Sequence, residues 1–168
     1  MIAAAFTGSG AGVVATAAMD LLWYRRYRHD GGSQSFASWE FSTDASDFAD
    51  DAPAPARVGK RIADVVGIEI DESSVGTTNN LMHWTTGVGW GKVAGIAAAV
   101  LPVPTLLVGT ATGATAWGTS YAVLGRLGIY KPTTQYDKET LWKDLSAHLV
   151  FGFTLGVALS AGNALRRR

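Results

Sequence analysis

The chain of 168 residues has the length of one domain, and only 17% of its residues are charged, against roughly 25% in an average soluble domain. Its formal net charge of zero gives no basic footprint for nucleic acid. The absence of cysteine excludes disulfides, thiolate metal sites and thiol catalysis.

Residues 2–24 form an apolar run that predicts a first transmembrane helix. At 1.5 Å per residue, such a run matches a hydrocarbon core of about 30 Å. Gly8 and Gly12 form a GxxxG stripe along which another helix can approach closely. Asp20 lies about one turn inside an aromatic and basic belt. We expect it to be an interfacial carboxylate paired with Tyr24 or an arginine, with a proton or ligand site as the alternative.

Residues 25–80 form a polar insertion in which aromatic residues are spread among serines and aspartates. This pattern predicts short amphipathic segments that lie on the membrane surface. One of them is a helix over 56–66, with its apolar residues on one face and Gly67 at its end. The insertion has too little apolar material for its own core, so we expect one membrane domain over 1–168.

Residues 81–101 predict the second span, which contains His83 and Lys92. A lysine near the middle of a bilayer costs about 2.5–3.5 kcal/mol on insertion scales. We therefore expect Lys92 to face the bundle interior or to extend its stem toward the interface. Its role, whether structural or functional, is left open by the sequence.

Two further spans are predicted over 105–125 and 146–165. The very short reversal at 102–104 makes the second and third spans antiparallel neighbours. The last span contains His148. The predicted fold is therefore all-α: a polytopic four-helix transmembrane bundle with a cytoplasmic interfacial insertion.

The two halves of the chain share a pattern of small residues. His-x3-Gly-x3-Gly begins at His83 and returns at His148, and a GxxxG pattern followed thirteen positions later by arginine occurs in the first and third spans. This indicates an internal repeat of two parallel helical hairpins. The glycines expected at helix–helix contacts are Gly8, Gly12, Gly87, Gly91, Gly109, Gly113, Gly152 and Gly156. We expect the stripes of spans two and four to pack directly on each other, with each histidine at the start of its helix, hydrogen-bonded to a neighbouring side chain or loop carbonyl.

The loops at 25–80 and 126–145 contain ten of the fourteen lysines and arginines. The positive-inside rule then places both loops in the cytoplasm and both termini outside, although the arginines at 166–168 oppose this orientation.

Three functions fit these residues. The first is a non-enzymatic structural or accessory membrane component, with lipid and a homo-oligomer or membrane-complex partner around it. The second is a haem b protein with His83 and His148 as axial ligands. The third is a small transporter or proton path that uses Asp20, Lys92 and the histidines. We expect no catalytic residues, no metal and, in the first case, no cofactor, because the common hydrolase and phosphate-loop motifs do not occur.

The glycine-rich first span, the segment Ala52-Pro-Ala-Pro-Ala-Arg-Val-Gly and the motif His83-Trp-x-x-Gly87 resemble the YagU-like group of bacterial inner-membrane proteins. The resemblance covers most of the chain. It implies a multi-pass protein of the bacterial plasma membrane with a four-helix design, and it implies no particular activity.

Overall fold

The computed structural model describes residues 1–43, 45–49 and 51–166, and this part of the chain is all-helical, with 78% helix and no strand. The long helices are α1 (Ile2–His29), α4 (Val75–Val100), α5 (Thr105–Arg126) and α6 (Lys138–Arg166). The connections contain α2 (Phe36–Glu40), α3 (Ala54–Val66) and the 3₁₀ turns η1 (Glu72–Ser74) and η2 (Thr133–Gln135). Arg167 and Arg168, two of the terminal arginines that oppose the predicted orientation, lie outside the described residues.

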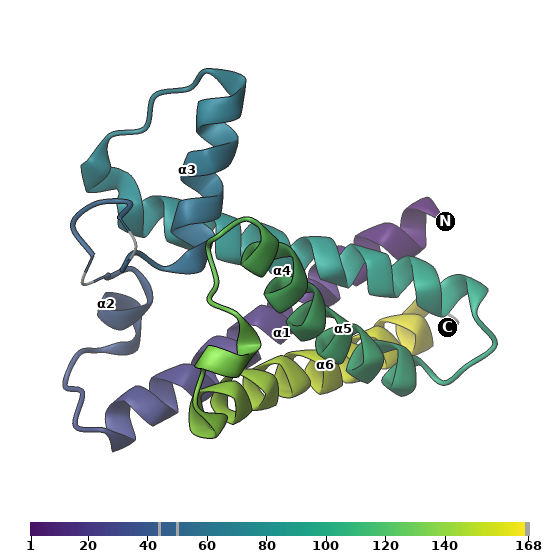
Figure 1. The fold of residues 1–168 in the computed structure, drawn as a ribbon. Helices are drawn as coiled ribbons and strands as arrows, with labels where there is room; N and C mark the ends of the chain where they lie inside the picture. Colours follow the sequence, from purple (N-terminus) through teal and green to yellow (C-terminus); the bar gives the residue numbers. More distant parts are fainter. Residues whose placement is uncertain (44, 50, 167–168) are drawn as a thin grey trace.

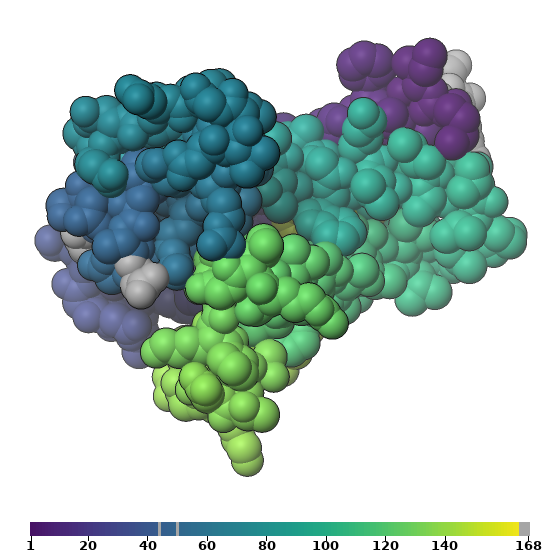
Figure 2. Space-filling model, turned by 45° about the horizontal axis from the view of Figure 1, so that its top comes forward, coloured from purple at the N-terminus to yellow at the C-terminus, as the bar shows by residue number. Residues whose placement is uncertain are grey.

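The long helices alternate in direction along one common axis. Helices α1 and α5 run away from the end that holds both termini, and α4 and α6 return to it (Figure 1). The insertion and the α5–α6 connection therefore lie together at the opposite end, where they form two neighbouring lobes (Figure 2). We call this the loop end of the molecule.

Three of the long helices extend beyond the predicted spans. Helix α1 continues to His29 and ends before Gly31, whose φ of 94° is a conformation that favours glycine. Helix α4 begins at Val75 instead of residue 81. Helix α6 begins at Lys138 instead of residue 146, because the Asp137 carboxylate accepts the Thr140 backbone N–H at 2.7 Å and caps it. The prediction that His83 and His148 stand at the starts of their helices is therefore wrong: each lies about two turns or more inside.

Helices α1 and α4 approach until their backbones touch. A Cβ added to Gly12 would lie 2.6 Å from the carbonyl oxygen of Gly87, and one added to Gly8 would lie 2.9 Å from the Cα of Gly95. Real Cβ atoms do not come this close to backbone, so only glycine fits at these positions.

Helices α5 and α6 form a second pair of the same kind. A Cβ on Gly113 would lie 2.8 Å from the Cα of Gly152, and one on Gly152 would lie 2.7 Å from the carbonyl oxygen of Gly109. Gly87, Gly91 and Gly95 of α4 thus face α1, and Gly152 and Gly156 of α6 face α5. The expectation that the stripes of α4 and α6 pack on each other is wrong, because each stripe has a closer partner within its own pair.

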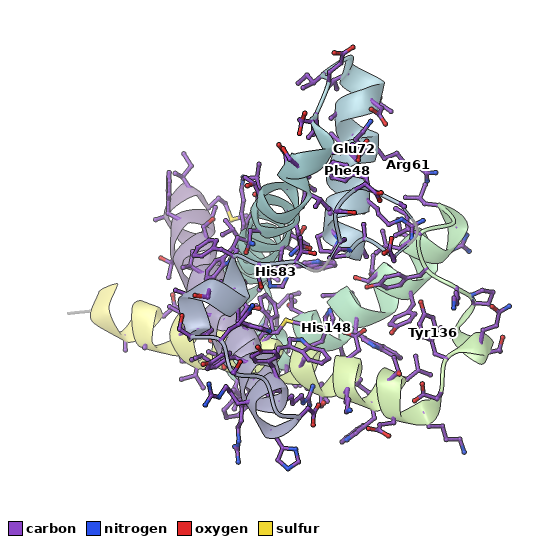
Figure 3. The ribbon with its side chains drawn as sticks, turned by 90° about the vertical axis from the view of Figure 1, so that its left-hand side faces the viewer. Phe48, Arg61, Glu72, His83, Tyr136 and His148 are labelled. Carbon is purple, nitrogen blue, oxygen red and sulfur yellow. The ribbon has the colours of Figure 1, made fainter. Side chains whose placement is uncertain are left out.

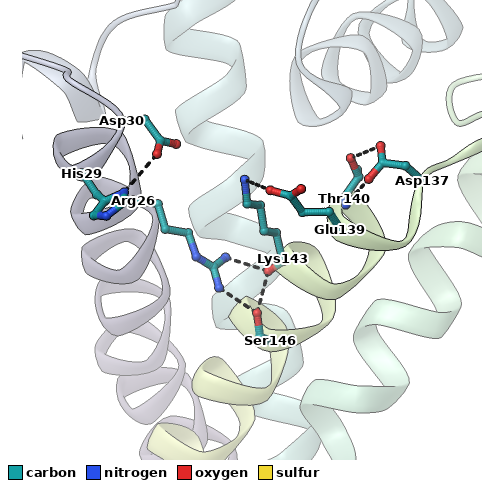
Figure 4. Close-up of polar contacts among 8 residues, drawn as sticks. All are labelled: Arg26, His29, Asp30, Asp137, Glu139, Thr140, Lys143 and Ser146. Carbon is teal, nitrogen blue, oxygen red and sulfur yellow. Dashed lines mark hydrogen bonds and ion pairs between the residues drawn. The ribbon is translucent and has the colours of Figure 1, made fainter.

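The two pairs are joined mainly by α1 and α6. Alanines and Met19 of α1 pack against larger apolar residues of α6, and the buried members of this core include Ala15, Phe151, Leu155 and Leu159. Toward the loop end, the Arg26 guanidinium donates to the Lys143 carbonyl and to the Ser146 hydroxyl, both at 2.7 Å (Figure 4). Arg26 also lies 4.8 Å from the centre of the Trp23 ring. These contacts fix the angle between the pairs.

The insertion rests on the bundle. Gly59 of α3 lies against Thr78 and Met82 of α4, where a Cβ would come within 2.8 Å of the Met82 Cγ. Trp39 of α2 lies against Tyr24 of α1, with ring centres 5.5 Å apart. The described part of the insertion thus packs on the long helices, and it also contains a small buried cluster of Ala52, Ala56 and Val75.

The glycine contacts predict opposite effects for neighbouring alanine substitutions on α1. Gly12→Ala places a methyl group against the backbone of α4, and such overpacking typically costs about 1–3 kcal/mol. Gly10→Ala meets no atom within 4 Å and should gain up to about 1 kcal/mol of helix propensity. Thermal unfolding in detergent should show a lower Tm for the first variant and an equal or higher Tm for the second.

The second pair offers the same comparison. Gly113→Ala meets the backbone of α6, whereas Gly118→Ala on the same helix meets no atom within 4 Å. Equal shifts in Tm for the two members of either comparison would contradict the close approach of the backbones.

Candidate functional site

A cavity of about 390 Å³ lies where the two helix pairs meet near the loop end. Its volume is within the range of about 300–1,000 Å³ that is typical of small-molecule sites. Most of its wall is apolar or aromatic, and includes Met19, Trp23, Met82, Trp90 and Phe151. The polar groups in the wall are His83 and Thr86 of α4, Thr16 of α1, Thr119 and Ser120 of α5, Tyr130, and Asp144 and His148 of α6.

Both sequence-predicted histidines line this one cavity, one from each helix pair (Figure 3). Helices α4 and α6 make little direct contact, because each packs on the partner within its own pair. The two histidines of the repeated His-x3-Gly-x3-Gly pattern thus lie in the wall of the same cavity.

His83 is held by a carboxylate from the neighbouring helix. Its Nε2 lies 2.8 Å from Oδ1 of Asp20, a residue that is only 4% exposed. The predicted partners of Asp20 were Tyr24 or an arginine, and this prediction is wrong: the Tyr24 hydroxyl donates instead to the Gln34 carbonyl. The other oxygen of Asp20, Oδ2, is buried and has no hydrogen bond within the described part of the chain.

A second carboxyl group lies close to the Asp20–His83 pair. The Trp84 indole donates to Oε1 of Glu40 at 2.9 Å. Burial raises the pKa of Glu40 above its usual value; the hydrogen bond from Trp84 opposes this shift, and the negative charge of Asp20 adds to it. His83 therefore has two carboxyl groups near it, that of Asp20 on α1 and that of Glu40 on α2.

His148 is held within its own helix. Its Nδ1 lies 3.0 Å from the Asp144 carbonyl oxygen and 3.3 Å from Oδ1 of the same residue. Tyr130 lines the cavity beside them. Burial, with the nearby Asp144 carboxylate as the second cause, raises the pKa of Tyr130 to about 12, so the phenol is neutral at physiological pH.

These partners determine which ring nitrogen remains available. The groups that face His83 Nε2 and His148 Nδ1 are a carboxylate and a carbonyl, which only accept hydrogen bonds, so these two nitrogens donate. In the neutral imidazole the other nitrogen then has a free lone pair: Nδ1 of His83 and Nε2 of His148. Histidines that bind metals commonly have such an acceptor behind them, which fixes the tautomer.

The structure separates Lys92 from this site. Lys92 is exposed on the outer side of α4 and does not line the cavity, which excludes the first of its two predicted positions, the bundle interior, and leaves a stem that extends toward the interface. Within the described residues, no group of three or more His, Cys, Asp or Glu side chains could hold a metal ion. Asp144 was missed as a site residue, although its spacing of four from His148 places both on one helix face.

The Asp20–His83 pair makes a prediction about stability. His83→Leu leaves the buried Asp20 carboxylate without its donor, and breaking a buried pair in this way typically costs about 3–5 kcal/mol. Thermal unfolding should show a large fall in Tm, and adding Asp20→Leu to the same chain should recover much of it.

His148→Leu is the matched control, because it removes contacts with the carbonyl and carboxylate of Asp144 in the same helix, and the Asp144 side chain is 20% exposed against 6% for Asp20. We expect it to cost about 1 kcal/mol. A double variant no more stable than His83→Leu alone would contradict the pairing. So would equal losses from His83→Leu and His148→Leu.

The chain has been compared with family models, with curated proteins and with solved structures, and none of them matches it. The cavity and the two histidines that line it are therefore the basis for a functional assignment.

Proposed function

We propose that this chain is a non-enzymatic, multi-pass protein of a bacterial inner membrane, similar to the YagU-like group, that holds a small, largely apolar ligand between its two helix pairs. The observation that carries the proposal is the cavity of about 390 Å³, whose wall contains a histidine from each pair. The proposal has two parts, a location in the membrane and the binding of a ligand in the cavity.

The membrane part of the proposal starts from α1 and α6. These two helices are long and apolar enough to cross a bilayer. Helices α4 and α5 lie antiparallel beside them, so a bilayer crossed by α1 and α6 also surrounds α4 and α5 (Figure 1). The shortest of the four, α5, has 22 residues and a length of about 33 Å, enough for a hydrocarbon core of about 30 Å.

The outer faces of the long helices support contact with lipid. Large apolar side chains are exposed on all four of them, including Val14 of α1, Val93 of α4, Leu107 of α5 and Phe153 of α6. Such a continuous apolar exterior is a liability in water. In this arrangement Lys92 faces lipid, and we expect its stem to extend toward the end that holds the termini.

The repeat and the orientation follow from the same arrangement. We propose that the pairs α1–α4 and α5–α6 are parallel repeats packed through GxxxG contacts. The sequence pattern equates Gly8 with Gly109 and Gly91 with Gly156. In the structure Gly91 faces Gly12, whereas Gly156 faces Gly109, so the position equivalent to Gly109 is Gly12, one helical turn after Gly8. The loop end, with most of the basic residues, faces the cytoplasm, and both termini lie outside.

The wall of the cavity indicates what kind of ligand fits. Thr16 and Ser120 donate their hydroxyls to carbonyls of their own helices, so the strongest acceptors that a ligand meets are the imidazole lone pairs and the Asp144 carboxylate. An apolar molecule with a hydrogen-bond donor at one or both ends satisfies both the wall and these nitrogens. Lys92 lies outside the cavity, which removes it from a proton path through the histidines.

A haem b group is a second candidate, because both imidazoles line one cavity between helices that do not pack on each other. His83 would hold the haem iron through Nδ1 and His148 through Nε2, while hydrogen bonds to Asp20 and to the Asp144 carbonyl would orient the two rings.

The membrane arrangement is testable with single cysteines, because the chain contains none. Ser120→Cys lines the cavity, whereas Ala114→Cys is exposed on α5 outside it. In inside-out membrane vesicles, a charged thiol reagent should label Ser120→Cys and the loop sites Ser46→Cys and Thr133→Cys. Ala114→Cys should react only after detergent solubilisation. Rapid labelling of Ala114→Cys in intact vesicles would contradict the third span, and labelling of either loop site from outside intact cells would contradict the orientation.

The visible absorption spectrum of the purified protein separates the two candidates. We expect no Soret band, because the first candidate needs no cofactor. A Soret band that disappears in both His83→Ala and His148→Ala, but persists in Lys92→Ala, would establish the haem function instead.

A further inference from the structure

Helix α3 has two apolar faces, and only one of them is covered by the protein. Ala56, Gly59 and Ala63 are buried against the bundle. On the other side Ile62 is 52% exposed, Val65 83% and Val66 61%. Three adjacent branched side chains exposed in this way indicate a contact that the chain itself does not supply.

The direction of α3 is unusual in this molecule. It runs across the common axis of the long helices and projects sideways from the loop end (Figure 1). A bilayer crossed by α1 and α6 has its plane perpendicular to that axis, so α3 lies parallel to the membrane surface. This is the orientation of an interfacial amphipathic helix.

Two arginines fix the depth of α3 relative to the bundle. Arg61 donates to the Leu127 carbonyl at 2.5 Å, and Arg57 donates to the Ile129 carbonyl at 3.0 Å. Leu127 follows the last residue of α5. Helix α3 is therefore attached where a proposed span leaves the bilayer, and the cationic groups lie near the C-terminal end of the α5 dipole, where positive charge is favoured.

One edge of the exposed face of α3 borders the segment that follows α5. A groove of about 200 Å³ is lined by Val58, Ile62, Val65 and Val66 of α3 together with Leu127 and Ile129. From Leu127 the apolar surface continues along α5 through the exposed Val123. The exposed apolar face of α3 thus meets the bundle at Leu127, directly after the end of α5.

We propose that α3 is an in-plane membrane anchor whose groove and exposed valines are covered by lipid acyl chains. The proposal rests on the membrane location proposed above. The charges fit this occupant: Arg61 at the groove and the exposed Arg126 and Lys131 beyond it lie at the level of the headgroups, where anionic lipids attract them.

The experiment measures the depth of single labelled sites in the full-length protein. Val65→Cys and its neighbour Asp64→Cys are labelled with the fluorophore bimane in nanodiscs of phosphatidylethanolamine and phosphatidylglycerol. Asp64 is exposed on the polar side of α3, and its ion pair with Lys60 is a surface contact of little energetic weight. Val14→Cys on the outer face of α1 reports on the span itself.

Doxyl lipids, which quench only fluorophores that reach the acyl chains, should quench the labels at 65 and 14 at least threefold more than the label at 64. Quenching at 14 with none at 65 would overturn the anchor and leave the membrane location standing. No quenching at either 14 or 65 would overturn both. Equal quenching at 64 and 65 would show that α3 has no fixed lipid face. A Val65→Cys disulfide dimer formed under mild oxidation, without quenching, would assign the face to a second copy of the chain.

Discussion

The contact of one helix backbone with another, made through glycine, is the constraint on which this structure depends. Where Gly8 and Gly12 meet Gly95 and Gly91, there is no side chain between the helices, so neither can slide or rotate without a clash. The same holds for α5 and α6. Each pair is therefore a rigid unit with one register, and everything else in the bundle is placed by the way in which the two units lie together.

The register of the first pair also explains its polar contact. Going along the helices in steps of four, Gly8 faces Gly95, Gly12 faces Gly91, and Thr16 faces Gly87. The next step brings Asp20 to His83, which are hydrogen-bonded at 2.8 Å. In the second pair the same steps place Trp117 opposite His148. That histidine meets no acid across the pair and bonds to Asp144 of its own helix instead.

The sequence was sufficient for the all-helical fold, for the direction of each long helix and for the turn at 102–104, because apolar periodicity and prolines act locally. It predicted two hairpins but not the helix that each glycine stripe of α4 and α6 faces, since similar stripes occur on all four helices and their spacing does not say which of them meet. The pairing of Asp20 with His83 depends on that choice. It was therefore missed, although its spacing follows once α1 is paired with α4. The sequence left two positions open for Lys92, because the cost of a charge in lipid does not say which face of the helix is turned inward, and the register of α1 with α4 turns Lys92 outward.

The cavity is a consequence of pairing within each half. Because α4 and α6 each pack closely on another helix, they diverge near the loop end, and side chains as large as Trp23, Trp90 and Phe151 do not fill the space between them. The two histidines in its wall then have different significance. His83 donates a hydrogen bond to a buried carboxylate and thereby stabilises the fold, so its presence in the wall has a structural explanation. His148 is hydrogen-bonded within its own helix, so helix packing does not require a histidine in this part of the wall, and the proposed ligand would give it a role.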